Sequence, residues 1–267
     1  MPLRVPGSTI SGRQGGFLCH PRIPDHGCQF LDYPDSEGTV ETLEVAQVED
    51  KKLAAPLAKS QVEAAMRLYG YSESWQTVDG VFDSLHQSFP YFDQQSTLLK
   101  VTVVNALYST NIYAVARMAE HVGNLIRARG SLPPDVQFVE QLATSHGLPG
   151  RFYSFASKFA HFFFDGEQFP IYDSYAVRMV TYHLGKAGCL NDKDHLYRSF
   201  VVNFNRLKES IDFPATNREL DRYLFLAGQY RAWKGLPPFK KPHAGISPEI
   251  LRLFKDREDD ASRFLGT

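Results

Sequence analysis

Apolar side chains recur at three- and four-residue intervals from residue 58 almost to the end of the chain, which is the spacing of an amphipathic helix. Helices are predicted from a capping-box start at Ser60, then over residues 77–89, 94–108, 112–129, 136–145, 152–164, 173–184, 194–211 and 217–233, and last from Pro248. There is no internal repeat and no convincing alternation typical of a strand. The pattern predicts an all-α fold.

Residues 1–57 differ from the rest of the chain. Gly, Pro, Ser and Asp are frequent there, and no periodic apolar pattern lasts. We interpret residues 1–57 as a loosely ordered extension that precedes one helical domain over residues 58–267. With 43% hydrophobic residues in 267, the chain can form one sizeable core or two small helical lobes around a cleft.

The extension contains two Cys/His pairs, Cys19-His20 and His26-x-Cys28. Their spacing matches no common zinc finger, so the prediction is an ordinary loop and no metal. The chain has three cysteines, and the third is Cys189. A sparse, odd number of cysteines argues against a disulfide framework and fits a reducing cytosol.

Targeting and charge narrow the class of protein further. The chain contains no run of 18 apolar residues, so no membrane span is predicted. Arg4 is not followed by the apolar stretch of a secretory signal, which favours a cytoplasmic location. The net charge of −1 weighs against nucleic-acid binding. However, residues 126–241 contain 16 basic and 11 acidic side chains, whereas residues 1–57 contain 5 and 8. The second half can therefore present a positive face to phosphates.

The stretch from Leu148 to Val180 carries the most specific chemistry. A glycine hairpin, Gly147-Leu148-Pro149-Gly150, precedes a helix, and Phe169-Pro170-Ile171-Tyr172 then leads to Asp173 at the start of the next helix. Glycine exposes backbone N–H groups and allows phosphate to approach closely. An Asp one short helix away can face the sugar of the same nucleotide, although Asp at this position is also a favoured N-cap.

These residues resemble the helix-hairpin-helix DNA glycosylase superfamily. Leu148-Pro149-Gly150 is similar to the start of its shared motif, and Asp173-Ser174-Tyr175-Ala176-Val177 is similar to its end. The resemblance implies a two-lobed helical bundle with a helix-hairpin-helix motif and a cleft between the lobes, with the hairpin and catalytic segment at residues 146–180. It implies DNA binding by Gly147, Gly150 and Arg151, and Asp173 as the catalytic carboxylate.

A second segment, Leu107 to Met118, resembles the 8-oxoguanine glycosylases within this superfamily. In that family a polar turn between two helices reaches the duplex at the lesion. The resemblance assigns this part to Ser109, Thr110 and Asn111. The alternative is that these three residues only cap the following helix.

A third resemblance concerns a pocket for the base. Gln229 and Trp233 lie four residues apart, on one face of their predicted helix. In 8-oxoguanine glycosylases, a Gln and an aromatic residue at this spacing hold the flipped base. Tyr175 stands where the family has a His after the catalytic Asp and joins the predicted pocket. The alternative for Gln229 and Trp233 is ordinary amphipathic packing.

The sequence also departs from the family pattern. Phe152 stands near the place of the second hairpin glycine, and Ser154 aligns with the lysine of the strand-cleaving members. Lys158 lies one helical turn later. It can be the nucleophile of a lyase, it can contact phosphate or tune Asp173, or it is simply a solvated lysine. No four-cysteine run for an iron–sulfur cluster exists. These departures predict a monofunctional enzyme without a cofactor.

The expected function is hydrolysis of the N-glycosidic bond of a flipped, damaged or modified base in DNA, by a monomer in the bacterial cytosol or nucleoid. Oxidised, alkylated, mismatched and phage-type modified bases all remain open as substrates. Two alternatives remain: a DNA-binding helix-hairpin-helix protein without catalysis, in which Asp173 is only a cap, and a helical scaffold that merely shares the pattern.

Overall fold

The computed structural model describes residues 52–145 and 147–266. By its internal contacts the chain divides into the units Met1–Gln47 and Val48–Thr267, and every described residue belongs to the second unit. The Cys19-His20 and His26-x-Cys28 pairs lie outside the described residues, as does His146. Among the described residues, no helix is apolar over a stretch long enough to cross a membrane.

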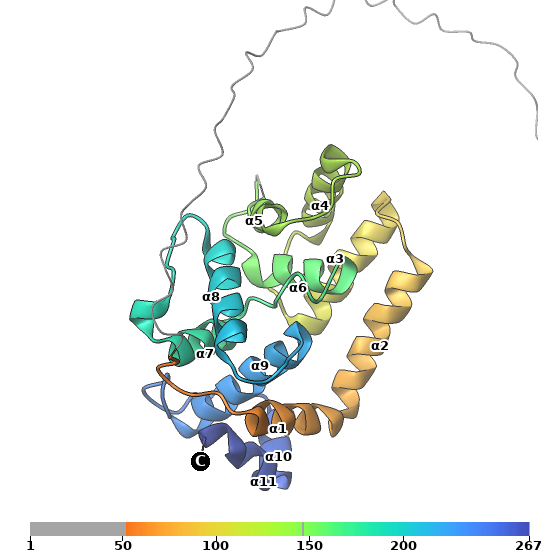
Figure 1. Cartoon of the computed structure of the whole chain (residues 1–267). Helices are drawn as coiled ribbons and strands as arrows, with labels where there is room; N and C mark the ends of the chain where they lie inside the picture. Colours follow the sequence, from red (N-terminus) through yellow and green to blue (C-terminus); the bar gives the residue numbers. More distant parts are fainter. Residues whose placement is uncertain (1–51, 146, 267) are drawn as a thin grey trace, which may run out of the picture. The chain divides into compact units, whose positions relative to one another are not determined.

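The described part of the chain consists of helices and loops without a strand, which confirms the predicted all-α fold (Figure 1). The α-helices are α1 (Lys59–Gly70), α2 (Glu73–Ser88), α3 (Gln94–Tyr108), α4 (Val115–Arg129), α5 (Val136–Ala143), α6 (Tyr153–Phe163), α7 (Ser174–Leu184), α8 (Leu196–Ser210), α9 (Asn217–Lys234), α10 (Pro248–Asp256) and α11 (Glu258–Ser262). Two 3₁₀ turns, η1 (Lys186–Gly188) and η2 (Arg263–Leu265), follow α7 and α11.

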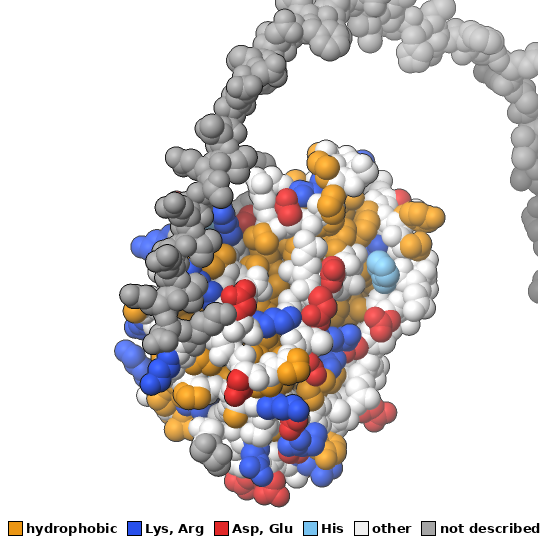
Figure 2. Space-filling model, viewed as in Figure 1, with side chains coloured by type: hydrophobic (Ala, Val, Ile, Leu, Met, Phe, Trp, Pro, Cys, Tyr) orange, Lys and Arg blue, Asp and Glu red, His pale blue; other side chains and the backbone are white. Residues whose placement is uncertain are grey.

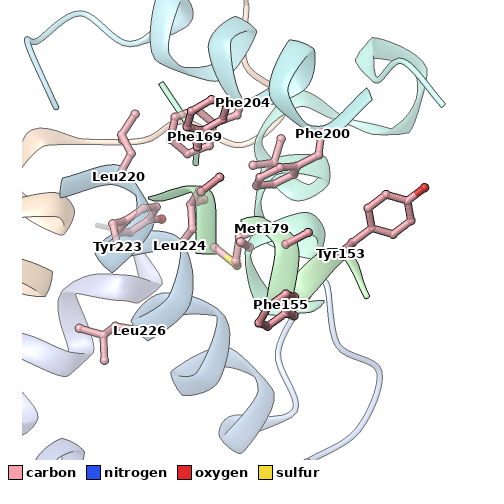
Figure 3. Packing of buried hydrophobic residues seen from close by; sticks show 14 of the residues in the cluster. Tyr153, Phe155, Phe169, Met179, Phe200, Phe204, Leu220, Tyr223, Leu224 and Leu226 are labelled. Carbon is pink, nitrogen blue, oxygen red and sulfur yellow. The ribbon is translucent and has the colours of Figure 1, made fainter. Parts of the chain in front are cut away.

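Helix α9 is central to the packing, because it contacts both α1 and α7, while α7 also contacts α8. Gly228 allows α7 and α9 to approach closely, since a Cβ atom at Gly228 would lie 2.8 Å from the Cβ of Tyr175. Figure 3 shows buried side chains of α6, α7, α8 and α9 gathered around this crossing, including Phe155, Met179 and Leu224. All three are fully buried. The crossing therefore fixes how α7 and α9 face each other.

Three helix starts differ from the sequence prediction, and that of α2 lies at Glu73 rather than at residue 77. Helix α1 begins at Lys59 after Ala58, whose backbone N–H donates to Oε1 of Gln61 at 2.9 Å, so Ser60 does not form the expected capping box. Helix α4 begins at Val115 rather than at residue 112, because Ile112 is buried in the preceding loop and hydrogen-bonded through its backbone to Asn105. At α1 and α4 the shifted start is accompanied by hydrogen bonds between a side chain and the backbone that span three and seven residues.

Part of the predicted extension is packed against the helices. The backbone N–H of Ala55 donates to the carbonyl of His183, and Nδ1 of His183 donates to the carbonyl of Ala55 at 2.7 Å. Nε2 of His183 then accepts from the hydroxyl of Tyr223 at 2.9 Å. Leu57 is buried beside them. These bonds fix the chain just before α1.

The C-terminal turn is held by a buried guanidinium group. Arg231 of α9 is 6% exposed and donates to the carbonyls of Pro237 and Phe264 and to the hydroxyl of Tyr182. Replacing it leaves buried carbonyl groups without a donor, and each such group costs about 1–3 kcal/mol.

Arg231→Met should therefore reduce the free energy of unfolding by about 3 kcal/mol or more, which lowers Tm by about 6–12 °C for a domain of this size. Arg252→Met is the matched control, because Arg252 is an exposed arginine of α10. Calorimetry of both variants checks the prediction. Equal Tm values for the two variants would show that the three bonds add nothing to stability.

Candidate active site

A cleft of about 1250 Å³ lies among residues of α1, α2, α3, α6, α7 and α9 and of the loops beside them. Its walls are largely apolar and aromatic, with a few ionisable side chains. Such a composition is typical of sites for small molecules or for single groups of a larger ligand. The ionisable side chains include Lys158, Asp173 and Asp221, which lie close enough together to perturb one another's pKa.

Asp173 is the N-cap of α7. Its Oδ1 accepts from the backbone N–H groups of Tyr175 and Ala176, both at 2.8 Å. Oδ2 accepts from none of the described residues. Burial raises the pKa of Asp173, and the ammonium group of Lys158 and the two backbone donors counteract that rise. Asp173 therefore caps α7 and also lines the cleft, and its catalytic role stays a prediction.

The extended segment before Asp173 is held first by two buried side chains. Nδ1 of His161 in α6 donates to the carbonyl of Phe169 at 3.0 Å. The hydroxyl of Tyr197 in α8 donates to the carbonyl of Pro170 at 3.0 Å. Burial lowers the pKa of His161 to about 4, so its ring is neutral at physiological pH.

Two further side chains hold the next two residues. The backbone N–H of Ile171 lies 3.2 and 3.1 Å from the two carboxyl oxygens of Asp221 in α9. The backbone N–H of Tyr172 donates to Oγ of Ser157 in α6 at 3.0 Å. Each residue from 169 to 172 thus forms a backbone hydrogen bond with a buried polar side chain. This segment presents Asp173 rigidly, which is what a catalytic group needs.

Lys158 is buried in α6 with 6% of its surface exposed, so the alternative of a solvated lysine is wrong. Its Nζ donates to Oγ of Ser154 at 2.8 Å and lies 3.4 Å from the Ser154 carbonyl. Burial lowers the pKa of Lys158, while the carboxylates of Asp173 and Asp221 counteract this. The long side chain therefore brings the amine back to the Ser154 position, one helical turn earlier in the sequence.

An aromatic part of the cleft is built on one face of α9. Phe225 and Gln229 both line the cleft, and the ring of Phe225 lies 6.3 Å from the rings of Trp75 and Tyr175. Gln229 is 4% exposed, and its side-chain Nε2 makes no hydrogen bond to the described residues. This region offers aromatic surfaces and two free amide protons to a planar polar ligand.

The structure separates Trp233 from this region. Trp233 does not line the cleft; its ring lies 6.2 Å from that of Phe254 in a stacked arrangement and 5.9 Å from that of Tyr230. The prediction that Trp233 shares the pocket with Gln229 is therefore wrong, because the C-terminal helix α10 covers that part of α9. Phe225, four residues before Gln229, is the aromatic residue that shares the pocket.

Asp221 and Phe225 escaped sequence reasoning, although a signal existed. Asp221, Phe225 and Gln229 are spaced by four residues and form one stripe along α9. A carboxylate within such an apolar stripe is unusual and indicates a buried polar role. The family resemblance covers only Gln229 and Trp233 of this helix and assigns no role to the stripe.

The predicted hairpin residues lie between α5 and α6, two helices in contact with each other. Gly147 and Gly150 adopt φ values of 88° and 112°, which favour glycine, and a Cβ at Gly147 would meet no atom within 4 Å. Neither glycine lines the cleft. Arg151 does line it, and its guanidinium also donates to the carbonyl of Lys193 at 3.1 Å.

The predicted polar turn does not cap α4. Ser109 ends α3 with φ 47°, Asn111 has φ 60°, and the N-cap of α4 is Ala114. Of the three predicted DNA contacts in this turn, Ser109 lines the cleft, whereas Thr110 and Asn111 do not. Oδ1 of Asn105 fixes the turn by accepting from the hydroxyl of Thr110 at 2.8 Å.

The cleft lining carries more basic than acidic side chains. The basic residues are Arg151, Lys158, Arg178, Arg218 and Arg222, and the acidic ones are Asp79, Asp173 and Asp221. Asp79 pairs with two arginines at once, because its Oδ2 accepts from Arg218 at 2.7 Å and from Arg222 at 2.9 Å, and this group of three retains one positive charge. On the face shown in Figure 2, by contrast, acidic and basic side chains are interspersed. The positive excess is a property of the cleft lining.

Neither a disulfide framework nor a metal centre is found in residues 52–145 and 147–266. Cys189 is a free, partly buried thiol there. No group of three or more His, Cys, Asp or Glu side chains in this part of the chain is arranged to hold a metal ion.

Comparison with known proteins places the chain in a family without naming an activity. An uncharacterized protein from Haemophilus influenzae is 33% identical over 142 residues, which cover 51% of this chain and 67% of that relative. The chain belongs to the same family as this protein. The family model HI_0787_N, described as an N-terminal domain, matches residues 61–167, which include Lys158 but not Asp173. No solved structure matches significantly.

Proposed function

We propose that the protein is a DNA glycosylase that hydrolyses the N-glycosidic bond of a damaged or modified base flipped into the cleft. The observation that carries this proposal is Asp173: a partly buried carboxyl group that lines a cleft of about 1250 Å³, with Oδ1 held by two backbone N–H groups and no donor to Oδ2 among the described residues. In such a reaction the sugar gains positive charge as the base departs. An ionised carboxylate stabilises that charge and deprotonates the attacking water.

The remainder of the cleft fits a nucleotide. The aromatic surfaces of Trp75, Tyr175 and Phe225 suit a flipped base, and the Gln229 amide can donate hydrogen bonds to its edge. The basic excess of the lining suits the phosphates. In this proposal α5, the glycine turn and α6 form a helix-hairpin-helix motif, the cleft separates two lobes, and a monomer binds duplex DNA in the cytoplasm.

A second candidate function adds cleavage of the DNA strand, and the position of Lys158 favours it. The monofunctional prediction depended on Ser154 occupying the place of a nucleophilic lysine. Because Nζ of Lys158 lies 2.8 Å from Oγ of Ser154, an amine does reach that place. Its lowered pKa leaves more of the amine neutral, as attack on the sugar requires.

The proposal is tested by incubating the purified protein with duplex DNAs that carry oxidised, alkylated, mismatched or hypermodified bases. Free bases are identified by mass spectrometry, and the DNA is assayed for abasic sites. We expect release of at least one modified base with an equal number of abasic sites. Salt-dependent DNA binding without any release would instead indicate a non-catalytic DNA-binding protein. The absence of both binding and release would indicate a helical scaffold.

Gln229→Ala and Trp233→Ala should have opposite consequences. Gln229→Ala should lower base release by about tenfold or more through lost hydrogen bonds to the base, and change stability little because Nε2 is unpaired. Trp233→Ala should cost about 2–4 kcal/mol of stability through lost ring packing, with unchanged release per folded molecule. Thermal unfolding and initial rates check both; loss of release with an unchanged Tm in Trp233→Ala would contradict this assignment.

A further inference from the structure

Asp221 is a carboxyl group of the cleft that has no role in the proposed hydrolysis and, unlike Asp79, no arginine partner. It is 6% exposed, lines the cleft from α9 and shares a stripe with Phe225 and Gln229. An ionised carboxylate offers about four acceptor sites, and burial is costly unless they are filled. The partners of Asp221 therefore determine which protonation state the site stabilises.

The partners of Asp221 are too few for an ionised carboxylate. Its only hydrogen bond with the described residues comes from the backbone N–H of Ile171, shared between both oxygens at 3.2 and 3.1 Å. Nδ1 of His161 lies 3.8 Å from Oδ2, but its proton is used by the carbonyl of Phe169. That ring is neutral, so it does not compensate a negative charge.

The other ionisable groups around Asp221 also leave it without a counter-ion. From α6 it faces Lys158, from α7 Asp173, and from α8 the hydroxyl of Tyr197, while Glu167 precedes α7. None of these forms an ion pair with Asp221, and Lys158 is shared with Asp173. Burial and the charge of Asp173 raise the pKa of Asp221 well above its usual range, whereas the Ile171 bond and Lys158 oppose this.

We propose that Asp221 is a carboxylic acid in the resting protein and donates its proton to the departing base. This inference rests on the proposed function. As the N-glycosidic bond breaks, its electron pair goes to the base nitrogen, which takes the proton from the Asp221 carboxyl group. Water adds to the sugar carbon and gives its proton to Asp173. Both carboxyl groups then return to their starting states by proton exchange with water in the cleft.

The two carboxyl groups thus differ by environment. Burial raises the pKa of both carboxyl groups. At Asp173 two backbone N–H groups and the charge of Lys158 oppose that rise, whereas Asp221 has one shared donor and no ion pair with a cation, and its pKa is raised further. A pair of carboxyl groups whose surroundings push their pKa values apart is the usual arrangement for one acid and one base in a site. Hydrolysis with a poor leaving group requires both.

The protonation state is tested without any substrate. In protein with ¹³C-labelled aspartate carboxyl groups, the Asp221 signal is identified by its absence from Asp221→Asn. We expect the chemical shift of a protonated carboxyl group at pH 7. We also expect Asp221→Asn to match the wild type in Tm at low pH and exceed it as pH rises, because a raised pKa in the folded state costs stability above the ordinary carboxyl pKa. A carboxylate shift at pH 7 would overturn the inference.

The donor role is tested with whichever base the wild type releases. Asp221→Asn keeps the acceptor for Ile171 and cannot transfer a proton, so release should fall by about a hundredfold or more. The wild-type rate should decline as pH rises through the Asp221 pKa, and the variant should lose this decline. Asp165→Asn, an exposed turn carboxylate outside the cleft, is the control.

Each outcome separates the inference from the proposed function. A slower variant with the wild-type pH profile would assign Asp221 only to holding Ile171 in place, and an unchanged rate would exclude any role; both overturn proton donation. If the wild type releases no base from any DNA in the panel, the proposed function and the donor role fail together. The carboxyl shift still decides the protonation state in that case.

Discussion

Asp173→Asn should lower base release by about a thousandfold or more while leaving DNA binding intact. The amide keeps the shape of the carboxyl group and loses the charge that stabilises the developing cation. Asn is as good an N-cap as Asp, so the free energy of unfolding should change by less than about 1 kcal/mol. Single-turnover release of the base and anisotropy binding of the same duplex measure the two effects.

Asp93→Asn is the matched control for this experiment. Asp93 caps α3 with the same geometry, because its Oδ1 accepts from the backbone N–H groups of Gln95 and Ser96 at 3.0 Å. Asp93 does not line the cleft, so its variant should release the base at the wild-type rate. Unchanged release by Asp173→Asn would reduce Asp173 to a helix cap and remove the central support of the proposed function.

The pKa of Asp173 also sets the acid side of the pH profile. Because its pKa is raised in the folded protein, the carboxylate form is lost as pH falls through a value above the ordinary carboxyl range. Base release should therefore be lost on the acid side at a higher pH than an exposed Asp would give. A profile that is flat down to the ordinary carboxyl pKa would contradict Asp173 as the base.

The sequence predicted the helices well because each strong apolar period ends at an evident cap or breaker. The start of the helix after Asp173 could be predicted because its signals are close together in the sequence. They are the Asp, the Pro three residues before it and the apolar period that follows. The helix starts at residues 59, 73 and 115 were misplaced. At the first and third, side chains of Gln61 and Asn105 bond the backbone three and seven residues away, which apolar spacing does not reveal.

The site was only partly predictable, because it is assembled from helices far apart in the sequence. Whether Lys158 is solvated or buried depends on what packs over α6. Whether Trp233 lines the cleft likewise depends on what packs against the end of α9. Asp221 contacts Ile171 across 50 positions of sequence. A stripe along one helix can identify a face, but only the tertiary structure shows whether that face meets a cleft or another helix.

If the protein also cleaves the strand, as the second candidate function requires, borohydride should trap a covalent complex between the wild-type protein and DNA that carries the base it releases. Lys158→Gln should lose this complex by about a hundredfold or more. A strand-cleaving enzyme forms an imine between a lysine amine and the opened sugar, and borohydride reduces that imine to a stable amine. Lys158 lines the cleft, and burial has lowered the pKa of its amine. Trapping should consequently rise with pH and level off below the ordinary lysine pKa.

Lys100→Gln is the control that makes the Lys158 result specific. Lys100 is also fully buried, and burial lowers its pKa to about 8, but its Nζ donates to the carbonyl of Tyr91 and the residue does not line the cleft. Its variant should still be trapped as long as it folds, because a lowered pKa without access to the sugar has no chemical consequence. If the wild type gives no trapped complex and its product is cleaved only by hot alkali, the enzyme is monofunctional. Lys158 would then act by contacting phosphate or by adjusting the charge of Asp173.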